Sequence, residues 1–263
     1  MNHRGGLALI RGTWLSWMQY RSFFFILAFG WMVPPLVAMF VWTAAAGDGE
    51  VGGIQRSVFV AYYLVLILVN QLTYSQTNWT VGDIIREGIL NHWLIRPLSP
   101  LYQIISSEIA GKVVYLVFTI PIVTILIVFL KPSFSFSAGQ FLIFWLALLL
   151  AWALRFLWGL WIALLAFWAT RADALLALQD SLIFIFSGMI APVAILPGFL
   201  QKLAEFLPFR YMVGFPVEIL IANLSDQQIQ TGFIIQSLWL LFTAILCWII
   251  YKKGLLRYSA IGG

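Results

Sequence analysis

The sequence predicts an all-α protein that is embedded in a membrane. Of its 263 residues, 62% are hydrophobic and only 10% are charged, and the mean hydropathy is +0.96. A soluble domain of this length could not remove so much apolar side chain from water, so lipid must solvate it. Thirteen Trp and nine Tyr residues add the amphipathic rings that favour membrane interfaces.

The apolar stretches predict about six transmembrane helices, because each is close to the roughly 20 residues that cross the hydrocarbon core. They cover residues 23–46, 58–79, 104–130, 141–168, 175–196 and 233–251. Together they predict one transmembrane domain over residues 1–263.

The positions of the cations orient these helices. If both termini lie in the cytoplasm, ten Lys and Arg residues fall on the cytoplasmic side and four fall on the outer side. The positive-inside rule favours this arrangement. We therefore expect cytoplasmic N- and C-termini, and the net charge of +5 needs no nucleic-acid partner to explain it.

Residues 1–22 predict an amphipathic helix on the inner membrane surface. One face carries Arg11 and Ser16. The opposite face is apolar and consists of Leu7, Ile10, Trp14 and Trp17. This pattern is typical of a helix that lies in the interface, and a simple anchor would have the same pattern.

A second amphipathic helix is expected at residues 82–95, between the second and third spans. Its polar face carries Asp83, Arg86, Glu87 and Asn91, and Ile85, Ile89 and Trp93 recur at helical spacing on the other side. Pro97 and Pro100 should end it. The charged face suits docking to a soluble partner, but an ordinary cytoplasmic loop on lipid head groups would have the same pattern.

Arg155 is an intramembrane charge near the middle of the fourth span, where a cation costs about 2.5–3.5 kcal/mol. It belongs to a row of small residues spaced four apart, namely Ala147, Ala151, Arg155, Gly159 and Ala163. Such a row lets another helix approach closely, so Arg155 should lie on a packing face. The candidate partners are Asp180, Glu108, and Asn70 or Gln71. We favour a structural pair over contact with substrate.

Residues 192–216 predict short helices that dip into the outer leaflet before the last span. Four prolines at positions 192, 197, 208 and 216 break the segment into pieces too short to span. Such backbone is tolerated at membrane depth only where protein or a water-filled cavity covers it. The segment could form an external gate or a plug. The residues assigned to a gate are Pro192, Pro197, Pro208, Phe209 and Glu218.

Signatures of catalysis and of ligand binding are missing from the sequence. His3 and His92 are the only histidines and lie far apart, so no His-rich metal site is expected. Gly111-Lys112 lacks the first glycine and the Ser or Thr of a phosphate-binding loop. Cys247 is the single cysteine and cannot form an intrachain disulfide. We therefore expect a noncatalytic chain that holds no cofactor or metal of its own.

Several segments resemble a known family. They are EGILNHWLIRPLSPLY at 87–102, RFLWGLWIALLAFWATR at 155–171, LPFRYMVGFPVEIL at 207–220 and the ending GLLRYSAIGG at 254–263. Their order is similar to that of ABC transporter permeases of the exporter class, which move polysaccharides, lipids and drugs. More narrowly, the chain resembles six-span bacterial permeases that are usually encoded in pairs beside one ATPase.

The resemblance implies a role for each unusual segment. Residues 82–95 would be the coupling helix on the ATPase, residues 1–22 the connecting helix, and residues 192–216 the external re-entrant helices. The contacts to the ATPase would come from Arg86, Glu87, Leu90, Leu94 and Arg96. ATP and Mg would bind in that partner ATPase.

The same resemblance implies a second permease chain, identical or related, that would complete the pathway in the lipid of a bacterial plasma membrane. The alternative function is a secondary carrier or channel that uses Arg155, Asp180 and Glu218 as charged relays.

Overall fold

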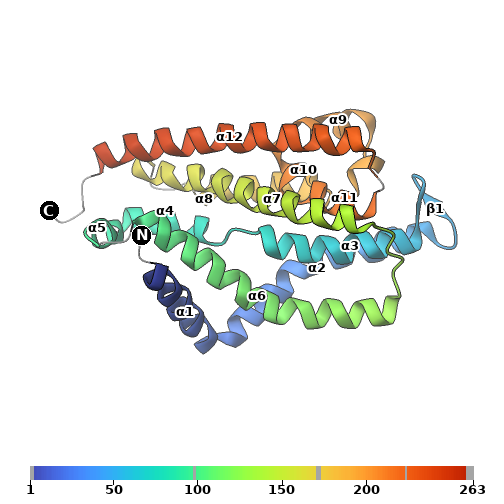
Figure 1. Cartoon of the computed structure of the whole chain (residues 1–263), viewed down its shortest axis with the longest axis horizontal. Helices are drawn as coiled ribbons and strands as arrows, with labels where there is room; N and C mark the ends of the chain where they lie inside the picture. The colour runs from blue at the N-terminus through green and yellow to red at the C-terminus, as the bar shows by residue number, and fades with distance from the viewer. Residues whose placement is uncertain (1–2, 97–98, 170–172, 223, 259–263) are drawn as a thin grey trace.

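The computed structural model describes residues 3–96, 99–169, 173–222 and 224–258, and it is built almost entirely of helices (Figure 1). In chain order the elements are α1 (His3–Gln19), α2 (Arg21–Ala46), β1 (Glu50–Val51), β2 (Ile54–Gln55), α3 (Arg56–Thr73), α4 (Thr77–Arg86), α5 (Ile89–Leu94), α6 (Pro100–Leu130), α7 (Ala138–Leu164), η1 (Leu165–Phe167), α8 (Asp173–Phe186), η2 (Val193–Ile195), α9 (Gly198–Phe206), α10 (Pro208–Met212), α11 (Gly214–Ile221) and α12 (Asp226–Arg257). The predicted all-α membrane fold is confirmed.

Five helical stretches of the described chain are long and apolar enough to cross a membrane. They are Arg21–Ala46, Arg56–Arg86, Pro100–Leu130, Ala138–Phe167 and Asp226–Arg257. The second stretch joins α3 and α4. The expected fifth span over residues 175–196 is wrong in its extent, because α8 ends at Phe186. Its 14 residues are about 21 Å long, which is less than the roughly 30 Å of hydrocarbon.

Aromatic donors from α2 and α3 explain why the chain leaves the helix after α8. Tyr62 donates to the carbonyl oxygen of Gly188 at 3.1 Å. Trp42 and Tyr63 donate to the carbonyl oxygen of Ile190 at 2.7 and 2.9 Å. Gly188 has a φ of 91°, a conformation that glycine adopts without strain. A continued helix could not satisfy the carbonyl of Gly188, because Pro192, four residues further on, has no N–H to donate. The aromatic donors therefore satisfy carbonyl groups that the helix itself could not.

The expected continuous helix over residues 82–95 is also wrong. Helix α4 ends at Arg86 and α5 begins at Ile89, because Gly88 adopts a left-handed conformation with a φ of 76°. Pro97 lies outside the described residues. Pro100 begins α6, where its missing N–H costs nothing, and Ser99 caps that helix.

The packing of α7 against its neighbours follows the small-residue row that the sequence predicts. Ala147, Ala151, Arg155, Gly159 and Ala163 are all buried. Helix α12 runs along α7, and α3 and α4 pack against other parts of α7 (Figure 1). The prediction that this row is a packing face is confirmed.

Helices α1 and α6 interlock through two glycines. A Cβ at Gly6 of α1 would lie 1.6 Å from the hydroxyl oxygen of Tyr102 of α6. In the other direction, a Cβ at Gly111 of α6 would lie 2.8 Å from the Trp17 ring of α1. Trp14 and Trp17 therefore pack on the protein, but Leu7 of the predicted apolar face is 70% exposed.

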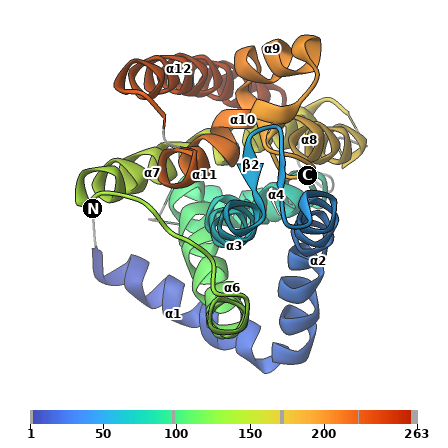
Figure 2. The same ribbon diagram turned by 90° about the vertical axis from the view of Figure 1, so that its right-hand side faces the viewer.

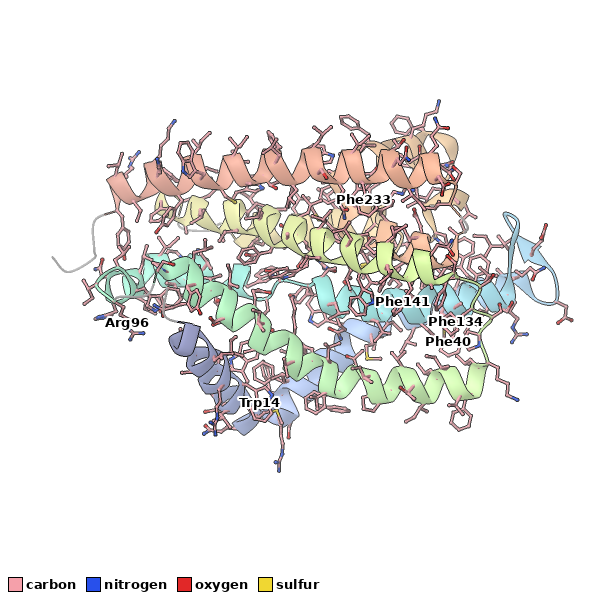
Figure 3. All side chains as sticks on the ribbon, viewed as in Figure 1. Trp14, Phe40, Arg96, Phe134, Phe141 and Phe233 are labelled. Atoms are coloured by element: carbon pink, nitrogen blue, oxygen red, sulfur yellow. The ribbon has the colours of Figure 1, made fainter. Side chains whose placement is uncertain are left out.

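Different elements lie at the two ends of the molecule. Helices α4 and α5 lie at one end, together with the end of α12, and the hairpin of β1 and β2 lies at the other end with α9 (Figure 1). The labelled side chains of Arg96 and Phe134 mark these opposite ends (Figure 3). Seen from the hairpin end, α10 lies between α12 and α8, α11 lies beside α7, and α9 lies at the top of the view (Figure 2).

Gly159 provides a test of the packing of α4 on α7. A Cβ there would lie 2.1 Å from Nδ2 and 3.2 Å from Cβ of Asn78, so Gly159→Ala must push the two helices apart. We expect a loss of about 1–3 kcal/mol in stability, seen as a lower unfolding temperature in detergent. Gly30→Ala is the matched control, because nothing lies within 4 Å of a Cβ at that helical glycine. Equal unfolding temperatures for the two variants would contradict the packing.

Candidate functional site

The break between α3 and α4 brings polar side chains together inside the apolar bundle. The chain leaves the helix at residues 74–76, so backbone groups there need partners other than lipid. Lys112 of α6 donates to the carbonyl oxygen of Tyr74 at 2.7 Å. Ser75 donates to Oε1 of Glu108 at 2.9 Å, and Lys112 lies 3.4 Å from Oε2 of the same carboxylate. We call Asn70, Thr73, Tyr74, Ser75, Gln76, Glu108, Lys112, Tyr115 and Arg155 the break cluster.

Arg155 completes the break cluster from α7. Its Nη1 donates to Oδ1 of Asn70 at 2.8 Å and to Oγ1 of Thr73 at 3.1 Å, and its guanidinium carbon lies 5.2 Å from the centre of the Tyr74 ring. The side chain is 4% exposed. Asn70 is therefore a correctly expected partner, whereas Gln71 donates to the carbonyl oxygen of Ala28.

The two carboxylates that were candidate partners interact with Arg155 only at longer range, and their direct contacts are with other groups. Glu108 contacts Ser75 and Lys112, as described above, and Gln179 donates to Oδ1 of Asp180 at 3.3 Å. Within the described ranges, neither carboxylate forms an ion pair with Arg155. Arg155 is consequently held by neutral hydrogen-bond acceptors and an aromatic ring.

Two further contacts tie the break to its neighbours. Asn78 at the start of α4 donates to the carbonyl oxygen of Phe156 at 3.2 Å. Tyr115 of α6 donates to Gln76, and Trp17 of α1 lines the small space beside Tyr115 and Lys112. The break is therefore fixed by α1, α6 and α7, and it connects α4 rigidly to the rest of the bundle.

Helices α4 and α5 present a mixed charged and apolar surface at their end of the molecule. Arg86 pairs with Asp83, and Glu87 and Arg96 are exposed. Leu94 is 42% exposed, as the docking role requires. Leu90 is only 4% exposed and packs in the cluster that contains Ile85, so it faces inward.

The sequence interpretation missed two exposed apolar side chains on this surface. Ile89 is 37% exposed and Ile95 is 83% exposed. The break at Gly88 rotates α5 relative to α4, and this rotation turns Ile89 outward and Leu90 inward. Gly88, a glycine within the expected helix, was the sequence feature that could have indicated the break. We call Glu87, Ile89, Leu94, Ile95 and Arg96 the end surface.

The proline-rich segment forms short pieces as expected, and the prolines mark their starts. Pro192 and Pro197 precede η2 and α9, and Pro208 is the first residue of α10. Phe209 is 4% exposed and packs against Trp158 with a ring-centre distance of 5.6 Å, so it belongs to the core.

Glu218 of α11, just after this segment, forms a buried ion pair that the sequence did not reveal. Nε of Arg210 lies 3.0 Å and Nη2 lies 2.5 Å from Oε2 of Glu218. Burial lowers the pKa of the Arg210 guanidinium, but the Glu218 carboxylate raises it more, so the net pKa lies above its ordinary value. The pair joins α10 to α11 across the irregular backbone at Val213.

Of the three charges of the alternative relay, Arg155 and Asp180 interact electrostatically, whereas Glu218 pairs with Arg210 instead. Glu218 contacts Arg210, Arg155 contacts Asn70 and Thr73, and Asp180 accepts from Gln179. In the part of the chain that the structure describes, no group of three or more His, Cys, Asp or Glu side chains could hold a metal ion.

Replacing Arg155 tests whether the break cluster is structural. Arg155→Leu leaves Oδ1 of Asn70 and Oγ1 of Thr73 without their donor, and each buried unpaired group costs about 1–3 kcal/mol. We expect lower abundance in membranes and a lower unfolding temperature. Arg56→Leu, at an exposed position, should change neither quantity. Normal abundance of Arg155→Leu combined with lost transport would indicate contact with substrate instead.

Comparison with known proteins is consistent with this architecture. The model of a family described as ABC-2 family transporter protein matches residues 29–262, which is most of the chain and includes both the end surface and the break cluster. No curated protein matches the chain. ABC-2 permeases are membrane transport components that are generally noncatalytic and generally paired with ATPase subunits. The chain therefore belongs to the ABC-2 transporter family and is an ABC transporter permease.

Proposed function

We propose that the chain is the permease subunit of an ATP-driven exporter and that the end surface docks on its ATPase. The observation that carries this proposal is the composition of that surface. Ile89, Leu94 and Ile95 are exposed beside the charged side chains of Glu87 and Arg96. Exposed apolar side chains among charged ones are typical of a protein interface.

The break cluster would transmit movement from the end surface into the bundle. Helix α4 leads directly from Glu87 to the break, where Lys112 and Arg155 hold the backbone and side chains of α3. A force on α4 would therefore reach α6 and α7 together. ATP can shift the permease only if the ATPase binds it more tightly in one of its two conformations.

The pathway itself would form between this chain and a second permease, identical or related. Long apolar helices with exposed side chains, such as α2 and α12, support contact with lipid or with such a partner. The distribution of Lys and Arg supports a cytoplasmic position for the end surface, in a bacterial plasma membrane.

The segment over residues 192–216 would then lie at the outer side. Pro192, Pro197 and Pro208 divide it into short helices, and the ion pair of Arg210 and Glu218 joins it to α11. This arrangement supports a gate that opens only when the pair separates. Phe209 would contribute as a core anchor, because it is buried.

Labelling from each side of the membrane tests the orientation. In a Cys247→Ser background, Glu87→Cys should react with an impermeant maleimide only in inside-out vesicles. Glu50→Cys, on the hairpin at the opposite end, should react only in right-side-out cells. Reaction of the Glu87 position from outside would place the end surface beyond the reach of an ATPase and would overturn the docking proposal.

Copurification tests the docking. The tagged chain, purified from its native membrane in mild detergent, should carry an ATPase activity with it through gel filtration. Glu87→Arg and Ile95→Asp should each reduce the copurified activity at least about ten-fold, because an interface hot spot contributes about 2 kcal/mol or more. Glu50→Arg is the matched charge reversal at the far end and should have no effect.

A different result would favour the secondary carrier. Transport driven by an ion gradient in vesicles that contain only this chain, without ATP, would contradict the proposal. The contacts of Arg155, Asp180 and Glu218 described above give that alternative no continuous path.

A further inference from the structure

Two cavities meet beside the buried ion pair at the hairpin end. The larger one has a volume of about 430 Å³ and lies between β2, η2, α9, α11 and the start of α12. The smaller one has a volume of about 340 Å³ and lies between α9, α10 and α12. Glu205, Arg210 and Gln228 line both. We propose that the two cavities bind the uncharged, hydroxyl-rich head group of an amphipathic molecule.

The three shared side chains each keep a polar group available. Arg210 uses Nε and Nη2 for Glu218, and among the described residues its Nη1 makes no hydrogen bond. Oε1 of Glu205 accepts from Gln201, which leaves Oε2 as an acceptor. Oε1 of Gln228 accepts from the backbone of Ser225, which leaves Nε2 as a donor. The side chains that line both cavities thus offer two donors, from Arg210 and Gln228, and one acceptor, from Glu205.

Hydroxyl groups match this set best, because each hydroxyl both donates and accepts. An ammonium group only donates, so it would leave Arg210 Nη1 and Gln228 Nε2 without acceptors. The side-chain amides of Gln201, in the larger cavity, and of Gln227, in the smaller one, add further hydrogen-bonding groups.

The charge of the site disfavours an anionic head group. Glu205 and Glu218 contribute two negative charges and Arg210 contributes one positive charge, so one negative charge is in excess. Arg210 is already neutralised by the bidentate bond to Glu218. A phosphate would therefore meet the unpaired carboxylate of Glu205 in a partly buried site, where charge repulsion is screened less than in water.

The larger cavity also has an apolar wall, which suits the alkyl part of an amphipath. That wall consists of Ile54, Val58, Val193, Ile221 and Leu224. A volume of about 430 Å³ lies within the range of small-molecule sites, which is about 300–1,000 Å³. That the bound molecule is the transported cargo rests on the proposed function, but the binding itself does not.

The test compares head groups on one alkyl chain. The full-length protein in phosphatidylcholine nanodiscs is titrated with octyl glucoside, octyl phosphate or octylammonium, each below its critical micelle concentration. Tryptophan fluorescence reports the unfolding temperature, which rises with a ligand that binds the folded state. We expect the glucoside to raise it most, with octyl phosphate having the smallest effect.

Variants locate the effect in the cavities. Glu205→Gln should lower the affinity for octyl glucoside about ten-fold, because a hydrogen bond to a charged group is lost. The same variant should bind octyl phosphate more tightly, because the excess negative charge is gone. Gln227→Ala should lower the affinity for octyl glucoside about five-fold. Gln230→Ala, on the same helix but exposed and outside both cavities, is the matched control and should not change it.

Two outcomes would overturn the inference. One is a larger rise in unfolding temperature with octyl phosphate or octylammonium than with octyl glucoside. The other is equal affinity for the glucoside in Gln227→Ala, Glu205→Gln and Gln230→Ala. Glucoside binding without ATPase capture would support this site and reject the proposed function, and ATPase capture without glucoside binding would do the reverse.

Discussion

A backbone break inside an apolar bundle must find all its hydrogen-bond partners within the protein, and this constraint organises the structure. Between α3 and α4, Lys112 satisfies the carbonyl of Tyr74, and Arg155 satisfies side chains one turn earlier. Two cations at membrane depth are costly on their own. The break supplies the Tyr74 carbonyl as an acceptor for Lys112, and the end of α3 supplies the acceptors for Arg155. Each cation and the groups around the break therefore satisfy one another.

The same principle operates at the other irregular segment by different means. Tyr62, Tyr63 and Trp42 satisfy the carbonyls after α8, and the pair of Arg210 and Glu218 joins the short helices that follow. Both irregular regions contact α7, because Arg155 binds the side chains before the break and Trp158 packs against Phe209 of α10. Helix α7, with its row of small buried residues, therefore connects them.

Much of this architecture could be predicted from the sequence because it follows from composition and spacing. Apolar length placed the long helices, the row from Ala147 to Ala163 identified the packing face, and the prolines marked the short helices. Gly188 and Pro192 were local signals that α8 ends early. The aromatic donors that satisfy the carbonyl groups after α8 could not be predicted, because they lie more than a hundred residues away in the sequence. The outward turn of Ile89 depends on one glycine dihedral, and Arg210 finds Glu218 only because the backbone changes direction between them.

The interlocking of α1 and α6 has a consequence for biosynthesis. Tyr102 of α6 packs on Gly6 of α1, and Trp17 of α1 packs on Gly111 of α6, so in each helix a glycine makes room for an aromatic ring of the other. The ribosome makes α1 first, yet its seat exists only after α6 has been synthesised and inserted. The N-terminal helix can therefore reach its position on α6 only after the intervening hydrophobic segments have been synthesised. Its final docking is a late event in the maturation of the chain, and it closes over Lys112 only then.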